Sequence, residues 1–275
     1  MTTHEFFWTT PDKLKIYAKE WKVEFPKAVI ALIHGLGEHC NRYNHVAEFF
    51  AGHNIATVAY DRRGHGQSEG KRGHTPKYEA FLTEVDTLLD ETRQRYPVSP
   101  VFLYGHSMGG NILLKYLIER KPEVAGAIST GAFIKFPDAP PALLIAIGKI
   151  MRKIYPSFSQ SNNLIVEGIS KDPKVVEAYK KDPLVHDRIT SATAIGMIET
   201  AAELERFSGE LPVPTLIMHG DEDKLTGFEG SKKFAERVSG NVTYRQWEKA
   251  YHELHNEPIK QEVFEYTLAW MRKYY

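Results

Sequence analysis

The sequence predicts an α/β fold in which a mostly parallel central sheet is flanked by helices. The first observation is a series of short apolar runs, each followed closely by glycine, aspartate or histidine, at 28–33, 55–60, 101–104, 124–129 and 213–218. Such runs are typical of strands that are buried on both faces, as in parallel sheets covered by helices. The second observation is that helix-length segments separate the runs, so strand and helix alternate along the chain.

The second apolar run, 55–60, leads into the polar loop DRRGHGQS. Its polar side chains are Asp61, Arg62, Arg63, His65 and Ser68. We expect these side chains to form a hydrogen-bonded structural loop. Ser68 is a poor candidate for a nucleophile because no strand, sharp turn and helix surround it.

The segment 77–96 is expected to be a helix, because Phe81, Val85 and Leu88 recur at helical spacing before Pro97. The elements expected later in the chain are helices over 109–120, 227–238 and 257–275, and a last strand that begins near Asn241. We find neither an internal repeat nor a low-complexity segment.

One segment, 132–211, interrupts the alternation of strands and helices. Its pattern is mainly helical, it is rich in proline, and it contains no predicted strand. We therefore expect a single domain over 1–275 with a helical cap inserted at 132–211. One cap helix is expected to carry an apolar stripe formed by Leu143, Leu144, Ile147, Ile150, Met151 and Ile154. The stripe either packs on the main domain or contacts lipid or an apolar substrate, and the two interpretations are compatible.

The composition is that of an ordinary soluble domain, with 42% apolar and 25% charged residues among 275. Lysine plus arginine and aspartate plus glutamate both number 35, so the basic excess typical of nucleic-acid binding is absent. The single cysteine, Cys40, excludes a disulfide within the chain and fits a reducing compartment. The N-terminal segment lacks the pattern of a signal peptide, and no apolar run could span a bilayer. We expect a cytoplasmic location, with peripheral membrane contact through the cap left open.

The stretch VFLYGHSMGGNILLKY predicts a nucleophile, Ser107. A buried strand leads into Gly105, His106, Ser107, Met108 and Gly109, and a helix follows. The pattern G-x-S-x-G in this context places a serine on a sharp turn above the end of the sheet. The glycines are needed because side chains there would collide with the neighbouring elements. The positive end of the following helix favours a developing anion.

A serine nucleophile needs a histidine base and an acid that orients it. In this fold the acid follows a later strand and the histidine follows the last one. The strand 213–218 leads into a loop with Asp221 and Asp223, and either could be the acid. The last strand leads into YHELH, which offers His252 and His255.

The two histidines of YHELH do not form a zinc motif. A zinc-binding helix of the type H-E-x-x-H has its histidines four positions apart, whereas His252 and His255 are three apart and follow a strand in a loop. We expect no metal ion and no organic cofactor.

An oxyanion hole needs backbone N–H groups directed at the attacked carbonyl oxygen. The residue after the nucleophile, Met108, supplies one of them. Leu36, in the HGLG turn after the strand 28–33, is the natural candidate for the other.

The chain resembles the α/β-hydrolase superfamily over nearly its whole length, and within it the monoacylglycerol lipase and lysophospholipase-like family. The matching pieces, in order, are HGLGEHCNRY, AYDRRGHGQSEG, GHSMGG, HGDEDKLT and YHELHNE. The resemblance implies that Ser107 is the nucleophile, Asp223 the acid and His252 the base, and it agrees with Leu36 and Met108 as the oxyanion hole. Asp221 is then expected to cap the turn.

The resemblance also implies a substrate site. Glu38, Arg42 and His255 lie where the family binds the polar glycerol end of its substrate, and the cap covers an apolar tunnel for the acyl chain. We therefore expect a serine hydrolase that cleaves monoacylglycerols to fatty acid and glycerol through an acyl-enzyme on Ser107.

Other functions remain open at this point. The first alternative is a lysophospholipase or a general carboxylesterase, and Arg42 could then serve a phosphate. The second is a hydrolase-fold binding protein without turnover, which the complete set of catalytic residues disfavours. The expected partner is a lipid ester, and the chain is expected to be a monomer or a homodimer.

Overall fold

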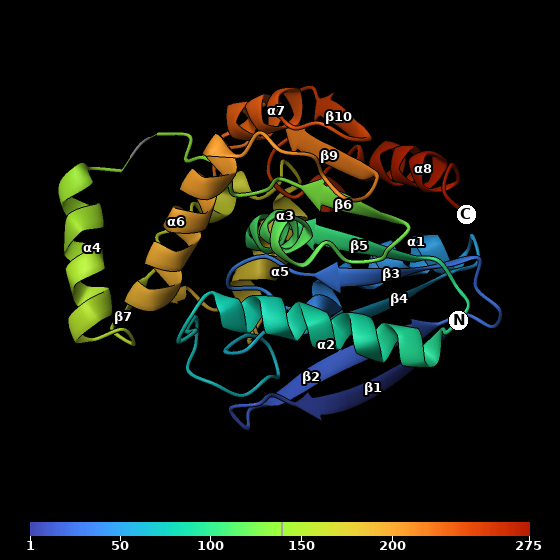
Figure 1. The fold of residues 1–275 in the computed structure, drawn as a ribbon, viewed down its shortest axis with the longest axis horizontal. Helices are drawn as coiled ribbons and strands as arrows, with labels where there is room; N and C mark the ends of the chain where they lie inside the picture. Colours follow the sequence, from blue (N-terminus) through green and yellow to red (C-terminus); the bar gives the residue numbers. More distant parts are fainter. Residues whose placement is uncertain (139) are drawn as a thin grey trace.

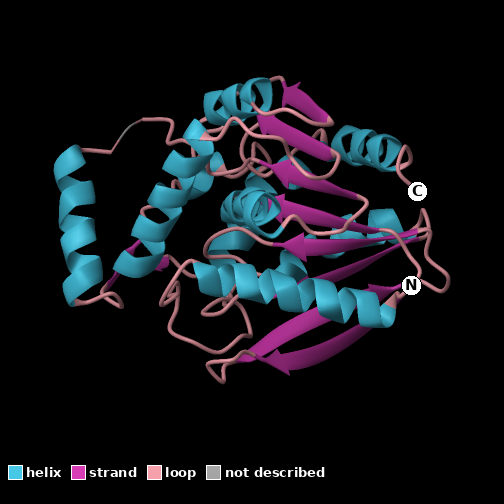
Figure 2. Ribbon diagram, in the orientation of Figure 1, coloured by secondary structure: helices cyan, strands magenta, loops and turns pink. Residues whose placement is uncertain are grey.

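The computed structural model describes residues 1–138 and 140–275. A sheet of eight strands crosses the molecule in the order β1-β2-β4-β3-β5-β6-β9-β10, with helices on both faces (Figures 1 and 2). Its strands are β1 Thr2–Thr9, β2 Lys15–Lys22, β3 Ala28–Ile33, β4 Ile55–Tyr60, β5 Val101–His106, β6 Gly126–Thr130, β9 Thr215–Gly220 and β10 Val242–Trp247. The predicted α/β-hydrolase fold class, with a mostly parallel sheet, is confirmed.

The six strands from β4 to β10 run parallel, whereas β1 and β2 form an antiparallel hairpin at one edge. The sequence did not predict this hairpin. Most side chains of β1 are exposed, so its sequence lacks the apolar run that marks the central strands. In the parallel part, all strands end at the same edge of the sheet. The loops that follow β3, β5, β6, β9 and β10 therefore meet there, which is where ligands bind in open α/β sheets.

The sheet separates two apolar cores because successive side chains of a strand point to opposite faces. Val29, Ala31 and Ile33 of β3 face one core, while Ala28 and Ile30 face the other. The first core includes side chains of α2 Glu79–Arg95, α3 Met108–Arg120 and α7 Phe228–Arg237. The second includes side chains of α1 Asn44–Ala51 and α8 Lys260–Met271.

The segment between β6 and β9 contains the expected helices. They are α4 Ala142–Ile154, α5 Pro173–Lys181 and α6 Ser191–Arg206. It also contains two strands of three residues that pair with each other, β7 Ser159–Ser161 and β8 Arg188–Thr190, which the sequence did not predict. Short 3-10 turns complete the structure at η1 Cys40–Tyr43, η2 Val166–Gly168 and η3 Leu254–Asn256.

Several hydrogen bonds tie this segment to the loops at the carboxyl edge of the sheet. The N–H of His186 donates to the carbonyl of Gly37 at 2.9 Å, and the His186 ring lies 3.0 Å from the carbonyl of Gly64. His39 lies 2.9 Å from the carboxylate of Asp182. The segment thus lies over the loops that follow β3 and β4.

Helix α4 stands at the outer edge of the molecule, beyond α6 (Figure 1). It packs on α6 through Gly148, where a side chain would collide with Ile195, and through the ion pair of Arg152 with Glu199. Most of the apolar stripe lies elsewhere on the helix. Of its six members only Met151 is half-buried, and the exposed ones are Leu143, Leu144, Ile147, Ile150 and Ile154. The interpretation that the stripe packs on the main domain is therefore wrong, because α4 uses another face for packing. Among the described residues, no helix is long and apolar enough to cross a membrane.

Candidate active site

Ser107 occupies a sharp turn between β5 and α3, with a backbone φ of 55° and ψ of −118°. This left-handed region is unusual for a residue with a side chain and stores strain. The flanking glycines make the turn possible. A Cβ atom on Gly105 would lie 2.5 Å from the carbonyl oxygen of Gly109, and one on Gly109 would lie 2.1 Å from the carbonyl oxygen of Ile33. The turn raises the serine above the edge of the sheet, as the sequence predicts.

Asp223 and His252 form a buried pair in the loops after β9 and β10. Nδ1 of His252 lies 2.6 Å from Oδ2 of Asp223. The other carboxylate oxygen, Oδ1, accepts hydrogen bonds from the N–H groups of Leu225 and Thr226 at 2.7 and 3.0 Å. The competing acid, Asp221, instead accepts the N–H of Lys249 at 2.6 Å in the turn after β10. The structure thus brings His252 together with Asp223 and not with Asp221.

Burial disfavours the charged forms of both Asp223 and His252, but the attraction between the two opposite charges and the hydrogen bonds together have the larger effect on both pKa values. Burial alone would raise the pKa of Asp223, yet the charge of His252 and hydrogen bonds from His252 and His219 hold the pKa of this carboxyl far below its usual value. Burial alone would lower the pKa of His252, yet the charge and hydrogen bond of Asp223 raise the pKa above its usual value. Asp223 is thus an anion, and its charge favours the protonated form of His252.

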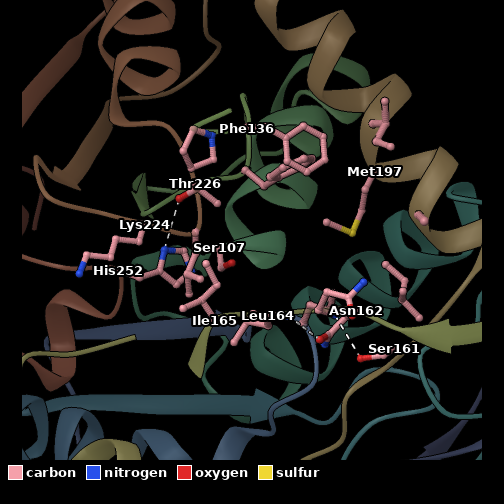
Figure 3. Close-up of a pocket in the computed structure, with 18 of the residues that line it drawn as sticks. Ser107, Phe136, Ser161, Asn162, Leu164, Ile165, Met197, Lys224, Thr226 and His252 are labelled. Atoms are coloured by element: carbon pink, nitrogen blue, oxygen red, sulfur yellow. Dashed lines mark hydrogen bonds between the residues drawn. The ribbon is translucent and has the colours of Figure 1, made fainter. Parts of the chain in front are cut away.

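A cavity of about 430 Å³ opens beside this pair, and both Ser107 and His252 line it (Figure 3). Because Nδ1 of His252 is engaged by Asp223, its Nε2 is the ring nitrogen left to exchange a proton. The apolar residues of the cavity wall are Leu36, Phe133, Phe136, Leu164, Ile165, Ile189, Ala194, Met197, Ile198 and Leu225. Polar side chains from the segment around β7 form another part of the wall, among them Ser161 and Asn162.

The two N–H groups predicted for the oxyanion hole lie beside the serine. Met108 begins α3, where backbone N–H groups have no partner within the helix. Leu36 lines the cavity together with Ser107. Within the described parts of the chain, neither N–H donates a hydrogen bond to another protein group. Both groups are free to receive an anionic oxygen.

The DRRGHGQS loop holds the backbone next to Leu36 in place. The guanidinium of Arg62 donates to the carbonyl of Gly35 at 2.5 Å, and the N–H of Arg62 donates to the His34 ring at 3.0 Å. Ser68 donates to the carbonyl of Asp61, so its hydroxyl is occupied. These contacts are those of a structural loop that supports the HGLG turn.

Of the three residues expected at the glycerol end, Glu38 lies beside Ser107, whereas Arg42 and His255 line neither the cavity nor the recess next to it. Glu38 lines a small recess next to Ser107, together with Tyr179 and Glu253. Its carboxylate accepts hydrogen bonds from the N–H of Gly35 at 2.5 Å and from the hydroxyl of Tyr43 at 2.8 Å. Glu38 is thus a buried acceptor that also fixes the HGLG turn.

Arg42 and His255 lie behind this recess. Arg42 donates two hydrogen bonds to Glu253, at 2.6 and 2.7 Å, and one to Glu38 at 2.6 Å, so its guanidinium is neutralised by two buried carboxylates. His255 is fully buried, stacks on Tyr43 with ring centroids 4.6 Å apart, and lines neither the cavity nor the recess. This placement contradicts the expectation that His255 lies at the glycerol end of the substrate site.

Several residues of the site escaped sequence analysis. The polar wall around β7 comes from a segment without a recognisable motif. His219, at the end of β9, contacts Asp223 but does not line the cavity. Its only sequence signal is its place two residues before Asp221 in HGDED. Among the described residues, no group of three histidine, cysteine or acidic side chains is arranged to hold a metal ion.

A family model described as "Serine aminopeptidase, S33" matches residues 24–259 of the chain. The chain belongs to this family of α/β hydrolases. The match includes every residue discussed above, from the HGLG turn to His255. The family resemblance inferred from the motifs is therefore confirmed.

Individual relatives agree with the family. This hydrolase is 34% identical to a monoacylglycerol lipase of Mycolicibacterium smegmatis, over 90% of this chain and 88% of that protein. The crystal structure of a Paleococcus ferrophilus monoacylglycerol lipase superposes with a TM-score of 0.82 at 28% identity, with 100% of both chains covered. An uncharacterized abhydrolase domain-containing protein of Dictyostelium discoideum is 37% identical over 96% of this chain, which spans only 28% of that protein. These findings confirm the predicted enzyme class, a carboxylic ester hydrolase.

Proposed function

We propose that this hydrolase cleaves monoacylglycerols to a fatty acid and glycerol through an acyl-enzyme on Ser107. The observation that carries the proposal is the form of the cavity beside Ser107. A largely apolar wall lies on one side of the serine, and a small recess with the carboxylates of Glu38 and Glu253 lies next to it. An acyl chain suits the first environment. The recess has a volume of about 10 Å³ and so has room for one small polar group, such as a single hydroxyl of an alcohol, next to carboxylates that already accept hydrogen bonds from Arg42.

In the first step, His252 takes the proton of Ser107 while the serine oxygen attacks the ester carbonyl. The N–H groups of Leu36 and Met108 stabilise the negative oxygen of the tetrahedral intermediate. The intermediate collapses, the bond to the alcohol breaks, and His252 gives its proton to the leaving glycerol oxygen. The acyl group is then bonded to Ser107.

In the second step, water attacks the acyl-enzyme while His252 takes one of its protons. The second tetrahedral intermediate expels the serine oxygen, which recovers its proton from His252. The fatty acid leaves, and the enzyme returns to its initial state. Asp223 stays ionised throughout and holds His252 in the tautomer that this cycle needs.

Hydrolysis of a panel of esters tests the substrate class. The purified enzyme is given monoolein, triolein, lysophosphatidylcholine and p-nitrophenyl butyrate, and kcat/KM is measured for each. We expect kcat/KM for monoolein to exceed that for triolein by at least about tenfold, because the small recess beside Ser107 leaves no room for further acyl chains. Lysophosphatidylcholine is expected to be poor, because Arg42 is already paired with two carboxylates. Equal rates on triolein and monoolein would contradict the proposal.

We further propose that the exposed stripe of α4 contacts a lipid surface that supplies the substrate. Leu143, Ile147 and Ile150 are 71%, 47% and 55% exposed on the outermost helix. Apolar side chains gathered on one face of a helix bind membrane interfaces by burial among the acyl chains.

Replacing Leu143, Ile147 and Ile150 together by serine is expected to weaken vesicle binding by at least about tenfold, because each loses an apolar side chain that enters the bilayer. Co-sedimentation with phosphatidylcholine vesicles measures the binding. Hydrolysis of soluble p-nitrophenyl butyrate is expected to stay close to that of the unmodified enzyme. The matched control is Val98→Ser, which removes an apolar side chain that is 92% exposed in the loop between α2 and β5. Undiminished vesicle binding by the triple variant would exclude α4 as the contact.

A further inference from the structure

Asp223 is bonded by two histidines, and only one of them belongs to the catalytic cycle derived above. Nε2 of His219 lies 3.0 Å from Oδ2 of Asp223, and Nδ1 of His252 lies 2.6 Å from the same oxygen. His219 is fully buried at the end of β9 and does not line the cavity. The carboxylate is thus shared between two imidazole rings.

The proton on His219 can be placed from its two partners. A carboxylate anion can only accept hydrogen bonds, so Nε2 of His219 carries a proton and donates it to Asp223. Nδ1 lies 2.8 Å from the hydroxyl of Ser231, which is buried in α7 and can donate to it. Ser231 therefore fixes the tautomer in which His219 points its N–H at the carboxylate.

The other donors to Asp223 leave a distinct place for His219. The N–H groups of Leu225 and Thr226 bond Oδ1, the oxygen that does not face His252. The hydroxyl of Thr226 lies 2.8 Å from Oδ2 but also 3.0 Å from the carbonyl of Gly131, and its one proton cannot serve both acceptors fully. Nε2 of His219 also lies 3.1 Å from the hydroxyl and 3.3 Å from the carbonyl of Thr226, but Oδ2 of Asp223, at 3.0 Å, is the nearest of the three acceptors and the charged one. Apart from His252, His219 is thus the imidazole ring that bonds Oδ2.

We propose that His219 is a positioning residue that shares the charge of Asp223 with His252 and so sets the pH range in which His252 works as a base. The inference rests on the proposed function, because it assigns His252 the role of base. A carboxylate that accepts a strong hydrogen bond from His219 attracts the imidazolium of His252 less than an otherwise identical carboxylate without that bond. His219 thereby keeps His252 from holding its proton too firmly.

Other charged and titratable groups also face the pair. Glu253, next to His252 in the chain, and Glu38, in the loop after β3, both favour the protonated form of His252. The ring of His106, at the end of β5, lies tilted against that of His252, with ring centroids 4.7 Å apart. These groups are present in every variant described below. A difference in pH profile between variants is therefore due to the change at residue 219 or 231.

The decisive comparison is between His219→Leu and His219→Gln. Leucine cannot donate a hydrogen bond, whereas the glutamine amide nitrogen stands as many bonds from Cα as Nε2 of histidine and can donate to Asp223. In His219→Leu the uncompensated carboxylate raises the pKa of His252. The base is then protonated over a wider range, and the acid limb of kcat/KM moves to higher pH by roughly half a unit to one unit. His219→Gln is expected to return the limb toward its original position.

The pH profile is measured with p-nitrophenyl butyrate between pH 5 and pH 10. The loss of kcat/KM in His219→Leu is expected to be several-fold larger at pH 6.5 than at pH 9, because a larger share of His252 is neutral in both proteins at the higher pH. An acid limb unmoved in folded His219→Leu would overturn the inference, and so would an equal displacement in His219→Gln. A shift to lower pH would also overturn it, because Asp223 would then have left His252.

If His219→Leu does not fold, as judged by circular dichroism, Ser231→Ala decides instead. It removes one buried hydroxyl, frees the tautomer of His219, and is expected to move the acid limb in the same direction by a smaller amount. No movement would then contradict the inference. Failure of the proposed function is a different result, since it would leave the unmodified enzyme without Ser107-dependent hydrolysis at any pH.

Discussion

Replacing Ser107 by alanine is expected to lower kcat by about 10⁶-fold on every ester the enzyme accepts. The variant keeps the cavity, the Asp223–His252 pair and both N–H groups of the oxyanion hole, but it lacks the oxygen that bonds the acyl group. Only the residual catalysis by oriented binding and the oxyanion hole remains. Alanine must still adopt the left-handed backbone of this turn, with φ of 55°, so the fold is checked by circular dichroism.

A fluorophosphonate probe gives the second measurement on this variant. The probe bonds covalently to an activated serine, so the unmodified enzyme is expected to be labelled and Ser107→Ala to remain unlabelled. Ser99→Ala is the matched control, because Ser99 lies in the loop before β5 and its hydroxyl bonds only the carbonyl of Pro26. Labelling of the Ser107→Ala variant would show that another residue is the nucleophile. The absence of labelling in the unmodified enzyme would favour a binding protein over a hydrolase.

The central part of the fold is readable in the sequence because each buried strand carries its own signal. The runs 28–33 and 55–60 became β3 and β4 without a change of boundary, since strands covered on both faces are apolar throughout. The position of Ser107 was also readable, because its turn requires glycine on both sides at fixed spacing. In these places the local sequence and the packing impose the same constraint.

The strands and contacts that the sequence did not predict have no comparable signal in the local sequence. Strand β1 lies at the sheet edge with most of its side chains exposed. Strand β2 is largely buried, but lysine and glutamate interrupt its apolar residues. The pair β7 and β8 has three residues in each strand, too few to show a period. The stripe of α4 was visible in the sequence, but the face that packs on α6 was not. That face includes Gly148 and Arg152, which lie outside the stripe.

The chemistry around the catalytic residues was readable only in part. A histidine that precedes an acidic loop can face any of several neighbours, so nothing in HGDED indicates that His219 bonds Asp223. Likewise, the spacing of His252 and His255 does not reveal that the second is buried against Tyr43 and His106. Side-chain direction at the end of a strand depends on the next turn, which the sequence alone does not determine.

Replacing Asp223 by asparagine is expected to lower kcat by about 10⁴-fold, because the asparagine amide can donate to Nδ1 of His252 and hold the wrong tautomer. The side chain keeps its size, so the effect is on charge and hydrogen bonding rather than on packing. Circular dichroism, which does not depend on an activated serine, separates a slow enzyme from a misfolded one. A loss of less than about tenfold would contradict the assignment of Asp223 as the acid and would require Asp221→Asn to be tested in its place.

The pH profile of Asp223→Asn provides a second, independent test. His252 accepts a proton only when neutral, so activity is lost as the pH falls through its pKa, which Asp223 holds above the ordinary value of 6.5. Without the carboxylate charge, burial, the largest influence on His252, is opposed only by the smaller effects of Glu253 and Glu38 and lowers the pKa of His252, so the acid limb is expected to move to lower pH. His219→Leu is expected to move the same limb upward, because it leaves the carboxylate in place with one donor fewer. Opposite displacements from two neighbouring residues are hard to explain by general disturbance of the fold, whereas they follow directly if both histidines bond one carboxylate oxygen.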